Sequence, residues 1–573
     1  MLSILLNWLY MGGMIYVCGC FLMQLFTKLV HKEQSVDFVS VMFAGIVFTT
    51  CYAQVFSIFY KVSFLANVML IIFACIYCIV QRKYMSNRII LAYQNFKGIS
   101  IFQKRIAVIG LFLVIVAFSM SSAGPAKLID TDWYHAQTIR WIEEYGCVKG
   151  VANLFYELGF NSAQHYFDAL FSMKCFIGQS LRGTGGFFGL LIFLHGFLRL
   201  LSFKNRKNHI ADALAIWEIA YSIIITAFYA DPYTDTMPNM IILFILTEWM
   251  SMLEKKEEDV EKFALLCILG VFATLAKTSA AMVVLLSIYP IYLLIKKKRK
   301  KEILLYLIIG FTISIPYLAT NIITTGYPII LLTELDFIPV KWKIDSEVIN
   351  YMRDNMIQFS RMPLGEMGEA LDCGLRWIPE WFRNESISHQ VLYISILVLV
   401  LFDLYFIIKN IITWIVKKQP LSDGWMILPR ICIYIGLTYW LLTIPQVKYC
   451  WSYLIFPVAV IPVYYFERNV SKKKIFSKAL LALAAGLLIL YTGFYGLRTI
   501  KYMVGSVPHN LVMQQDYENH VFNTVEKNGH TFYTRIEDGD IVCGYYIFPY
   551  LDNDEHLDEL VIGDDLGDGF YFE

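Results

Sequence analysis

The segment that decides the fold runs from Lys296 to Ile323. It opens with six basic residues, Lys-Lys-Lys-Arg-Lys-Lys, and after Glu302 it continues as ILLYLIIGFTISIPYLATNII. About 20 apolar residues are enough to cross a bilayer as an α-helix. Basic residues next to a membrane span are retained on the cytoplasmic side. This segment therefore predicts both a transmembrane helix and its direction.

The same pattern recurs along the whole chain, and we expect about 14 transmembrane helices. Apolar residues make up 57% of the sequence and charged residues only 17%, which is too apolar for a soluble chain. The 48 Lys and Arg nearly cancel the 47 Asp and Glu, which argues against nucleic acid as a partner. We therefore expect an all-α polytopic protein whose surroundings are the lipid bilayer. The other apolar stretches run Leu2–Phe26, Phe38–Phe59, Val62–Val80, Ile106–Met120, Gly186–Phe203, Ala211–Tyr229, Met237–Leu253, Phe263–Ala276, Ala280–Ile295, Val391–Val416, Met426–Ile444, Tyr453–Phe466 and Ala479–Leu497.

Basic residues collect in alternate loops, which fixes the expected orientation. Three large pieces then fall on the outer side: residues 123–185, residues 325–388 and the tail, residues 501–573. We expect three parts in the chain: N-terminal helices (1–105), a transmembrane core (106–500) and an extracytoplasmic C-terminal domain. The basic loops hold Lys28 and Lys32, Arg82 to Arg105, Lys204 to Lys207, Lys255 to Lys262, Lys296 to Lys301, Lys417 and Lys418, and Arg468 to Lys478.

The tail is acidic, with 15 Asp and Glu against three Lys and Arg. Two alternating runs, His530 to Arg535 and Asp540 to Phe548, predict short strands, with turns at Asn528-Gly529 and Asp538-Gly539. We therefore expect a small α+β domain. Its acidic end, Asp552 to Asp568, is interpreted as solvated surface, because its spacing fits no EF-hand loop.

The first outer loop carries the densest set of reactive side chains. Asp130, Asp132, His135 and Arg140 lie in the segment Lys127 to Trp141, which begins a few residues after the fourth span. Their position on the outer face, beside aromatic and basic residues, makes them candidates for a functional site, with His135 and Arg140 as candidate substrate contacts. The alternative is that Asp130 or Asp132 only caps the helix that follows.

A short outer loop holds two more carboxylates, Asp231 and Asp235, between two spans. Charged groups at membrane depth are costly and tend to line functional cavities. With Asp132, these residues could share a divalent cation, and oxygen ligands suit Mg²⁺, Mn²⁺ or Ca²⁺. The alternative is a tight turn in which Asp231 precedes a proline.

Isolated cations occupy the remaining outer hairpins. Lys277 and Lys448 each stand between two apolar spans, where a lipid phosphate is a natural partner and snorkelling to the interface is the alternative. Lys341 and Trp342 of the second large loop are further candidates for substrate contact. An enzyme on the outer face has neither ATP nor nucleotide sugars, and the sequence contains no Walker motif. Its energy must therefore arrive on a membrane carrier, such as a polyprenyl-phosphate sugar.

At these residues the sequence resembles the GT-C superfamily of integral-membrane glycosyltransferases. It more closely resembles a poorly characterised bacterial group of GT-C-like proteins that is linked to surface polysaccharide assembly. In Gln446-Val447-Lys448 the chain departs from the acidic-Pro-Arg type of segment expected of that group. The matching blocks are Asp130 to His135, Trp141 to Gly146, Leu158 to Ser162, Asp231 to Asp235, Lys277 to Ser279, Gly326 to Pro328, Val340 to Lys343 and Gly567 to Phe570.

The resemblance implies an enzyme of the bacterial plasma membrane with its active site outside. It would move a sugar from a polyprenyl phosphate to a hydroxyl of a glycan, lipid or protein, with inversion at the anomeric carbon. Asp130 or Asp132 would be the base, and the phosphate would leave against Lys277. Asn161 and Tyr327, in the matching blocks, join the expected substrate contacts.

Three other functions remain open from the residues. A polysaccharide polymerase would use lipid-diphosphate-linked repeat units, and we would expect arginines to dominate its outer loops. A lipid or glycan transporter would carry charges at the midplane, where the spans contain few: Glu218, Glu248 and Asp403. A scaffold without activity would lack a cavity joining Asp130, Asp231 and Lys277.

Overall fold

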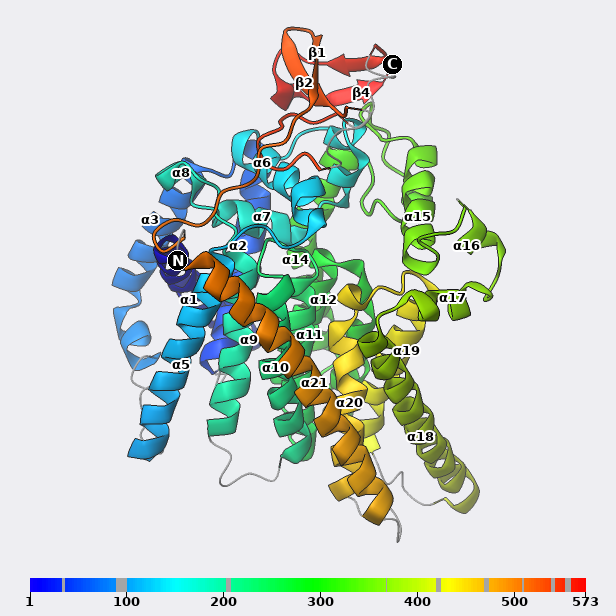
Figure 1. Cartoon of the computed structure of the whole chain (residues 1–573). Coiled ribbons are helices and arrows are strands. Elements are labelled where there is room, and N and C mark those ends of the chain that lie inside the picture. Colours follow the sequence, from blue (N-terminus) through cyan, green and yellow to red (C-terminus); the bar gives the residue numbers. More distant parts are fainter. Residues whose placement is uncertain are drawn as a thin grey trace.

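A bundle of long helices carries a cap of loops, short helices and strands at one end (Figure 1). The computed structural model describes residues 1–32, 37–88, 100–201, 208–366, 368–418, 424–467, 474–507, 510–536, 542–551 and 558–572. The bundle helices are α1 (Leu2–Val30), α2 (Phe38–Phe59), α3 (Phe64–Val80), α5 (Ile101–Ser122), α9 (Thr184–Leu201), α10 (His209–Phe228), α11 (Thr236–Glu254), α12 (Val260–Ala276), α13 (Ile288–Lys296), α14 (Lys301–Thr325), α18 (Ile387–Lys417), α19 (Ile427–Leu442), α20 (Trp451–Glu467) and α21 (Lys474–Ser506).

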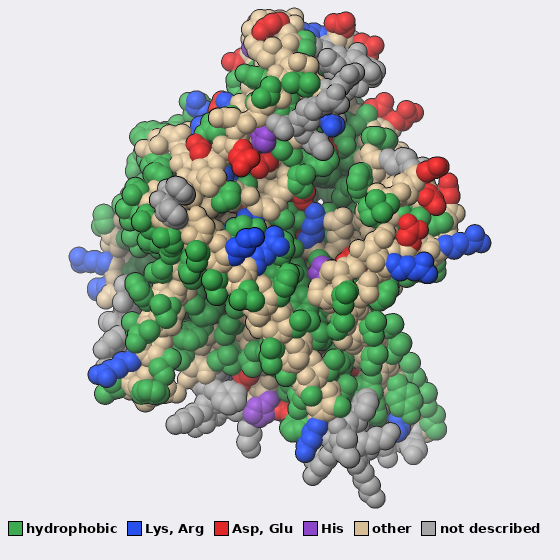
Figure 2. Space-filling model, in the orientation of Figure 1, with side chains coloured by type: hydrophobic (Ala, Val, Ile, Leu, Met, Phe, Trp, Pro, Cys, Tyr) green, Lys and Arg blue, Asp and Glu red, His purple; other side chains and the backbone are tan. Residues whose placement is uncertain are grey.

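The helices are those of a multi-pass membrane protein. Among the described residues, 11 helices are long and apolar enough to cross a membrane, or up to 12 if the bent pair Phe64–Val80 and Arg82–Arg88 is one span. Each of the fourteen expected stretches coincides with helical segments of the bundle. Three of the helices, α3, α12 and α20, have 17 residues each, at the lower end of the usual range for a span. Figure 2 shows hydrophobic side chains covering the bundle, with Asp and Glu gathered around the cap.

One expected span is not a regular α-helix. Its first part, η5 (Thr278–Ser287), is a ten-residue 3₁₀ helix, which continues into α13. Runs of 3₁₀ helix longer than three or four residues are uncommon, and inside a helix they often mark a functional hinge. The break begins next to Lys277.

The three pieces expected on one side of the membrane do lie at one end of the bundle (Figure 1). The first piece contains η1 (Thr131–His135), α6 (Ala136–Glu144), η2 (Val151–Asn153), η3 (Tyr156–Phe160), α7 (Ala163–Leu170) and α8 (Lys174–Ile177). The second contains η6 (Thr333–Leu335), α15 (Ser346–Arg361), α16 (Glu369–Asp372) and α17 (Trp377–Asn384). The 3₁₀ segments η7 (Gly424–Met426) and η8 (Val447–Tyr449) precede α19 and α20, and η9 (Leu566–Asp568) lies in the tail.

The tail forms two small antiparallel pairs, β1 (Asn523–Lys527) with β2 (His530–Thr534), and β3 (Leu560–Ile562) with β4 (Phe570–Phe572). The turn predicted at Asn528-Gly529 joins β1 to β2, and both residues have positive φ, 51° and 78°. This conformation is the one that a two-residue hairpin needs.

The second predicted strand, Asp540 to Phe548, is wrong. Its described residues, 542–548, form turns and irregular backbone. Their apolar side chains pack on the first outer loop, where Trp141 contacts Phe548 with ring centroids 4.7 Å apart. The apolar residues that suggested a strand are therefore buried by the first outer loop and not by a neighbouring strand. The predicted turn at Asp538-Gly539, residues 552–557 of the acidic end, and the basic residues at 89–99, 202–207 and 468–473 lie outside the described residues.

The tail is joined to the first outer loop by buried hydrogen bonds as well. Gln137 of α6 donates through Nε2 to the carbonyl oxygens of Gly544 and Ile547, at 2.8 and 2.6 Å. Arg140 donates to the carbonyl oxygen of Tyr545 at 2.7 Å. The cap is therefore one packed layer over the end of the bundle.

Candidate functional site

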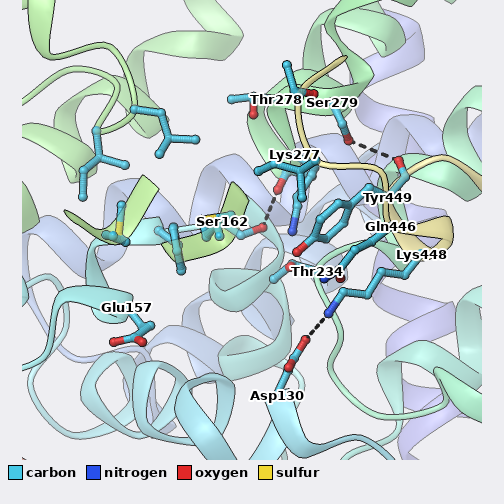
Figure 3. A pocket seen from close by; sticks show the side chains of 18 of the residues that line it. Asp130, Glu157, Ser162, Thr234, Lys277, Thr278, Ser279, Gln446, Lys448 and Tyr449 are labelled. Atoms are coloured by element: carbon cyan, nitrogen blue, oxygen red, sulfur yellow. Dashed lines mark hydrogen bonds and ion pairs between the residues drawn. The ribbon is translucent and has the colours of Figure 1, made fainter. Parts of the chain in front are cut away.

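A cavity of about 580 Å³ opens at the boundary between the bundle and the cap. Five parts of the chain contribute to its wall: residues 130–165, 234, 276–279, 317–359 and 439–453. Many of the side chains in the wall are aromatic or apolar (Figure 3). Cavities of this size and lining are typical of small-molecule and lipid sites. The residues that line the cavity include Asp130, Tyr134, Glu157, Ser162, His165, Thr234, Lys277, Ser279, Tyr317, Asn355, Tyr439, Trp440, Gln446, Lys448, Tyr449 and Tyr453.

Two lysines bring positive charge into this wall, and each faces one carboxylate. Lys448 Nζ lies 2.7 Å from Asp130 Oδ2, an ion pair that Figure 3 shows at the cavity wall. Lys277 Nζ lies 3.1 Å from Asp235 Oδ1 and 4.4 Å from the ring centroid of Tyr449. The isolated lysines of the two hairpins thus reach one cavity from different segments.

Electrostatics favours charged lysine at position 448. Burial alone lowers the pKa of Lys448, but Tyr449, Asp130 and Asp235 together outweigh it, so that the net pKa lies above its ordinary value. Burial also raises the pKa of Asp235, and Lys277 and Lys448 oppose that rise. The cavity therefore holds cations that an incoming anion can meet.

Asp130, Lys277 and Lys448 all lie at or next to irregular helical turns. Asp130 directly precedes the π-helical turn η1, and Lys277 directly precedes the 3₁₀ helix η5. Such departures from α-helix are common at functional sites. Lys448 lies in η8, the short 3₁₀ turn between α19 and α20.

The structure separates the two candidate catalytic carboxylates. Asp130 lines the cavity, whereas Asp132 does not. Asp132 lies near Arg182, Asp231 and the tail residue His520, and burial raises its pKa to about 6. The backbone carbonyl of Asp132 accepts a hydrogen bond from the amide of Gly544 at 2.6 Å. Asp132 therefore belongs to the junction between loop and tail.

The three expected metal ligands do not form one cluster, because Asp231 lies near Asp132 whereas Asp235 is paired with Lys277. Asp231 Oδ1 lies 3.5 Å from Arg182 Nε, and its Oδ2 accepts a hydrogen bond from the amide of Lys127 at 2.6 Å. Asp235 faces Lys277 instead. Among the described ranges, no group of three or more His, Cys, Asp or Glu side chains could hold a metal ion. A shared cation at Asp132, Asp231 and Asp235 thus has no ligand cluster here.

Of the eight expected substrate contacts, only Lys277 and Lys448 line the cavity. His135 is fully buried behind it, and its Nδ1 lies 2.7 Å from Nε2 of His165, which does line the wall. Asn161 is buried and donates to Thr320 and Asn321.

The other four expected contacts lie elsewhere in the cap. Arg140 bonds to the tail, and the buried amide of Tyr327 donates to Thr325 Oγ1. Trp342 donates through Nε1 to the carbonyl oxygen of Ile322, while Lys341 is exposed. Trp342 thus joins the second cap loop to α14, and Arg140 joins the first loop to the tail.

Several wall residues escaped the sequence reasoning, above all Glu157 and His165. A signal for His165 existed, since Gln164, His165 and Asp168 interrupt the apolar residues that follow the Leu158 to Ser162 block. Nothing in that stretch showed which side chain faces a cavity. The aromatic wall was equally invisible among the many aromatic residues of the spans.

A second, smaller cavity of about 310 Å³ adjoins the first. Gln446, Lys448 and Phe359 line both cavities, and the second also contains Arg361 and Glu385. Figure 2 shows the surface hollowed between the central body and the lobe of α15 to α17, with Lys or Arg side chains inside the hollow. Two adjoining chambers can hold two different molecules.

A family model for a domain of unknown function, DUF8201, matches residues 1–455. The chain belongs to the DUF8201 family. The DUF8201 match includes Asp130, Lys277 and Lys448 and ends before the tail. No curated protein and no solved structure matches the chain.

Proposed function

We propose that this protein is a membrane glycosyltransferase that takes a sugar from a polyprenyl-phosphate carrier. The observation that carries the proposal is the convergence of Lys277 and Lys448, with Asp130, on one aromatic-walled cavity at the end of the bundle. A phosphate ester with a hydrophobic tail fits this combination of cations and apolar wall. The resemblance to GT-C enzymes supports the same reaction.

In the proposed reaction, the acceptor hydroxyl attacks the anomeric carbon and the lipid phosphate leaves. Lys277 and Lys448 stabilise the charge that develops on the leaving phosphate. Asp130 receives the hydrogen bond of the attacking hydroxyl, because it is the carboxylate of the candidate pair that lines the cavity. A single displacement inverts the anomeric configuration.

We place the acceptor, a hydroxyl of a glycan, lipid or protein, in the second cavity. Its polar lining includes Arg361, Asn384 and Glu385, and it shares Lys448 with the donor cavity. The proposed setting is the outer face of a bacterial plasma membrane, in surface polysaccharide assembly, with the basic loops in the cytoplasm. In this proposal the chain crosses the membrane about 14 times.

A transfer assay with Asp130→Asn and Asp132→Asn tests the function. Purified protein in nanodiscs is given a panel of labelled polyprenyl-phosphate sugars with membrane extract as acceptor source, and the product's anomeric configuration is determined. We expect an inverted product and a loss of about 100-fold or more in Asp130→Asn. Asp132→Asn should retain most activity because Asp132 lies outside the cavity. Equal, wild-type turnover in both folded variants would contradict the assignment.

A lipid or glycan transporter is the second candidate, on one specific observation. His195 Nδ1 lies 2.8 Å from Glu218 Oε2, and its Nε2 lies 3.4 Å from Glu248 Oε1, inside the bundle. Buried ionisable clusters of this kind occur in proton-coupled carriers. Movement of an unmodified lipid-linked glycan across a reconstituted membrane, without sugar transfer, would favour this alternative.

A further inference from the structure

Two buried histidines form a pair behind the wall of the donor cavity. His165 of α7 lines the cavity, and its Nε2 lies 2.7 Å from Nδ1 of His135 in η1. Both side chains are completely buried. Within the described part of the chain, the outer nitrogens, Nδ1 of His165 and Nε2 of His135, have no hydrogen-bond partner. In either tautomer, one end of the pair offers a donor and the other an acceptor.

Charged groups surround this pair on the cavity side. Lys277 acts on both imidazoles and Lys448 on His135. The carboxylates of Asp235 and Asp130 are paired with these same lysines. Aromatic rings also contact the pair, with the ring centroids of Tyr134 and Tyr233 at 4.1 and 5.6 Å from that of His135.

Burial and the neighbouring positive charges favour the neutral form of both histidines. Burial first, and then Lys277, lowers the pKa of His165 to about 3. Burial, His165, Lys277 and Lys448 hold the pKa of His135 well below its ordinary value. An anion placed at the two lysines would offset the part of this effect that comes from their charge.

We propose that His165 is a further catalytic residue, which holds the proton of the acceptor hydroxyl at the end of the transfer, with His135 as its positioning partner. The inference rests on the proposed glycosyl transfer and deepens it. One bond forms, from the acceptor oxygen to the anomeric carbon, and one breaks, from that carbon to the phosphate oxygen. The electron pair of the broken bond stays on the phosphate, and the proton of the hydroxyl passes by way of Asp130, which receives its hydrogen bond, to His165 Nδ1.

Lys448 already engages the carboxylate of Asp130 at 2.7 Å, whereas Nδ1 of His165 has no hydrogen-bond partner among the described residues. In the product state the phosphate has gained one negative charge and the histidine pair one positive charge. The two charges stabilise each other across the cavity wall. Proton holding by the pair is therefore coupled to the presence of the lipid phosphate.

Proton uptake on product binding tests this coupling without any acceptor. Decaprenyl monophosphate is titrated calorimetrically into the full-length protein in nanodiscs, between pH 5 and 7, in buffers of different ionisation enthalpy. We expect wild type to take up more protons than His165→Gln, with a difference that grows toward about one proton per lipid as the pH falls. The ionisation of the ester is common to both proteins and cancels in the difference.

Three further variants make the result specific. His135→Gln should lower the extra uptake, because His165 loses its partner, and His165→Asn should abolish it as His165→Gln does. His209→Gln, at the opposite end of the bundle, should behave as wild type. Thermal melting selects the variants that fold.

The outcomes separate this inference from the function on which it rests. Tight binding with equal proton uptake in wild type, His165→Gln and His165→Asn would overturn the role of His165 and leave the donor site intact. Absence of binding to wild type would overturn the donor site itself, and the role of His165 with it.

Discussion

Two aspartates that stand two positions apart have different environments. Asp130 faces the cavity and Lys448, while Asp132 faces the junction with the tail. From the sequence, either aspartate could be the catalytic base, and nothing in the spacing distinguished them. What distinguishes them is the π-helical turn that begins at Thr131, together with a lysine 318 positions further along the chain. Neither is visible in a local motif.

Asp168 gives a pH-dependent prediction at the residue scale. It is buried in α7, and burial raises the pKa of its carboxyl to about 8. In the unfolded chain an aspartate titrates near pH 4. The folded state therefore binds more protons between these values, and its stability should fall as the pH rises from about 4 to 8.

Asp168→Asn removes this titration and should flatten the stability profile. We expect the variant to gain stability relative to wild type as the pH rises from 5 to 8, by several kcal/mol at most. Thermal unfolding in detergent at several pH values measures the difference. Parallel profiles for both proteins would show that Asp168 does not titrate in this range.

At the scale of elements, the sequence predicted the helices better than their irregularities. Length and hydropathy locate a span because any 20-residue apolar helix satisfies its backbone inside lipid. The same criterion does not report that η5 is a 3₁₀ helix, since the composition of Thr278 to Ser287 is that of an ordinary span. The alternating sequence pattern also misassigned residues 542–548 as a strand, because Cys543, Ile547 and Phe548 are buried against the first outer loop and not in a sheet.

The contact between α1 and α2 depends on two glycines. A Cβ on Gly19 would lie 1.9 Å from the carbonyl oxygen of Val41, and one on Gly45 equally close to that of Ile15. Gly13, on the same helix, has open space around its Cβ position. The helix backbones therefore touch at Gly19 and not at Gly13.

Gly19→Ala should consequently destabilise the protein, whereas Gly13→Ala should not. We expect overpacking to cost about 1–3 kcal/mol at Gly19, and Gly13→Ala to be neutral or slightly stabilising through helix propensity. Thermal unfolding of both variants in the same detergent provides the comparison. Equal melting temperatures would mean that α1 and α2 are further apart.

For the whole molecule, the near-zero net charge conceals a separation of charges. The cap carries the acidic tail, while the described basic run from Lys296 to Lys301 lies at the other end of the bundle. Sequence alone predicted this polarity, because it follows from counting charges between spans. It could not predict that segments from five parts of the chain share one cavity.

The polarity predicts a labelling result in intact cells. On a background without native cysteines, Lys341→Cys in the cap should react with a membrane-impermeant maleimide. Lys298→Cys, which is equally exposed at the opposite end, should react only after the cells are opened. The reverse pattern would place the cavity on the cytoplasmic side and remove the argument for a lipid-borne donor.

The central claim is that the cavity between Lys277 and Lys448 binds a polyprenyl phosphate. An experimental structure of the protein in nanodiscs with decaprenyl monophosphate tests it directly. The account predicts phosphate density within contact of both ammonium groups, with the lipid chain along the aromatic wall. It also predicts that the density is lost in Lys277→Met and kept in Lys341→Met. A cavity that stays empty at saturating lipid, or a phosphate bound elsewhere, would contradict it.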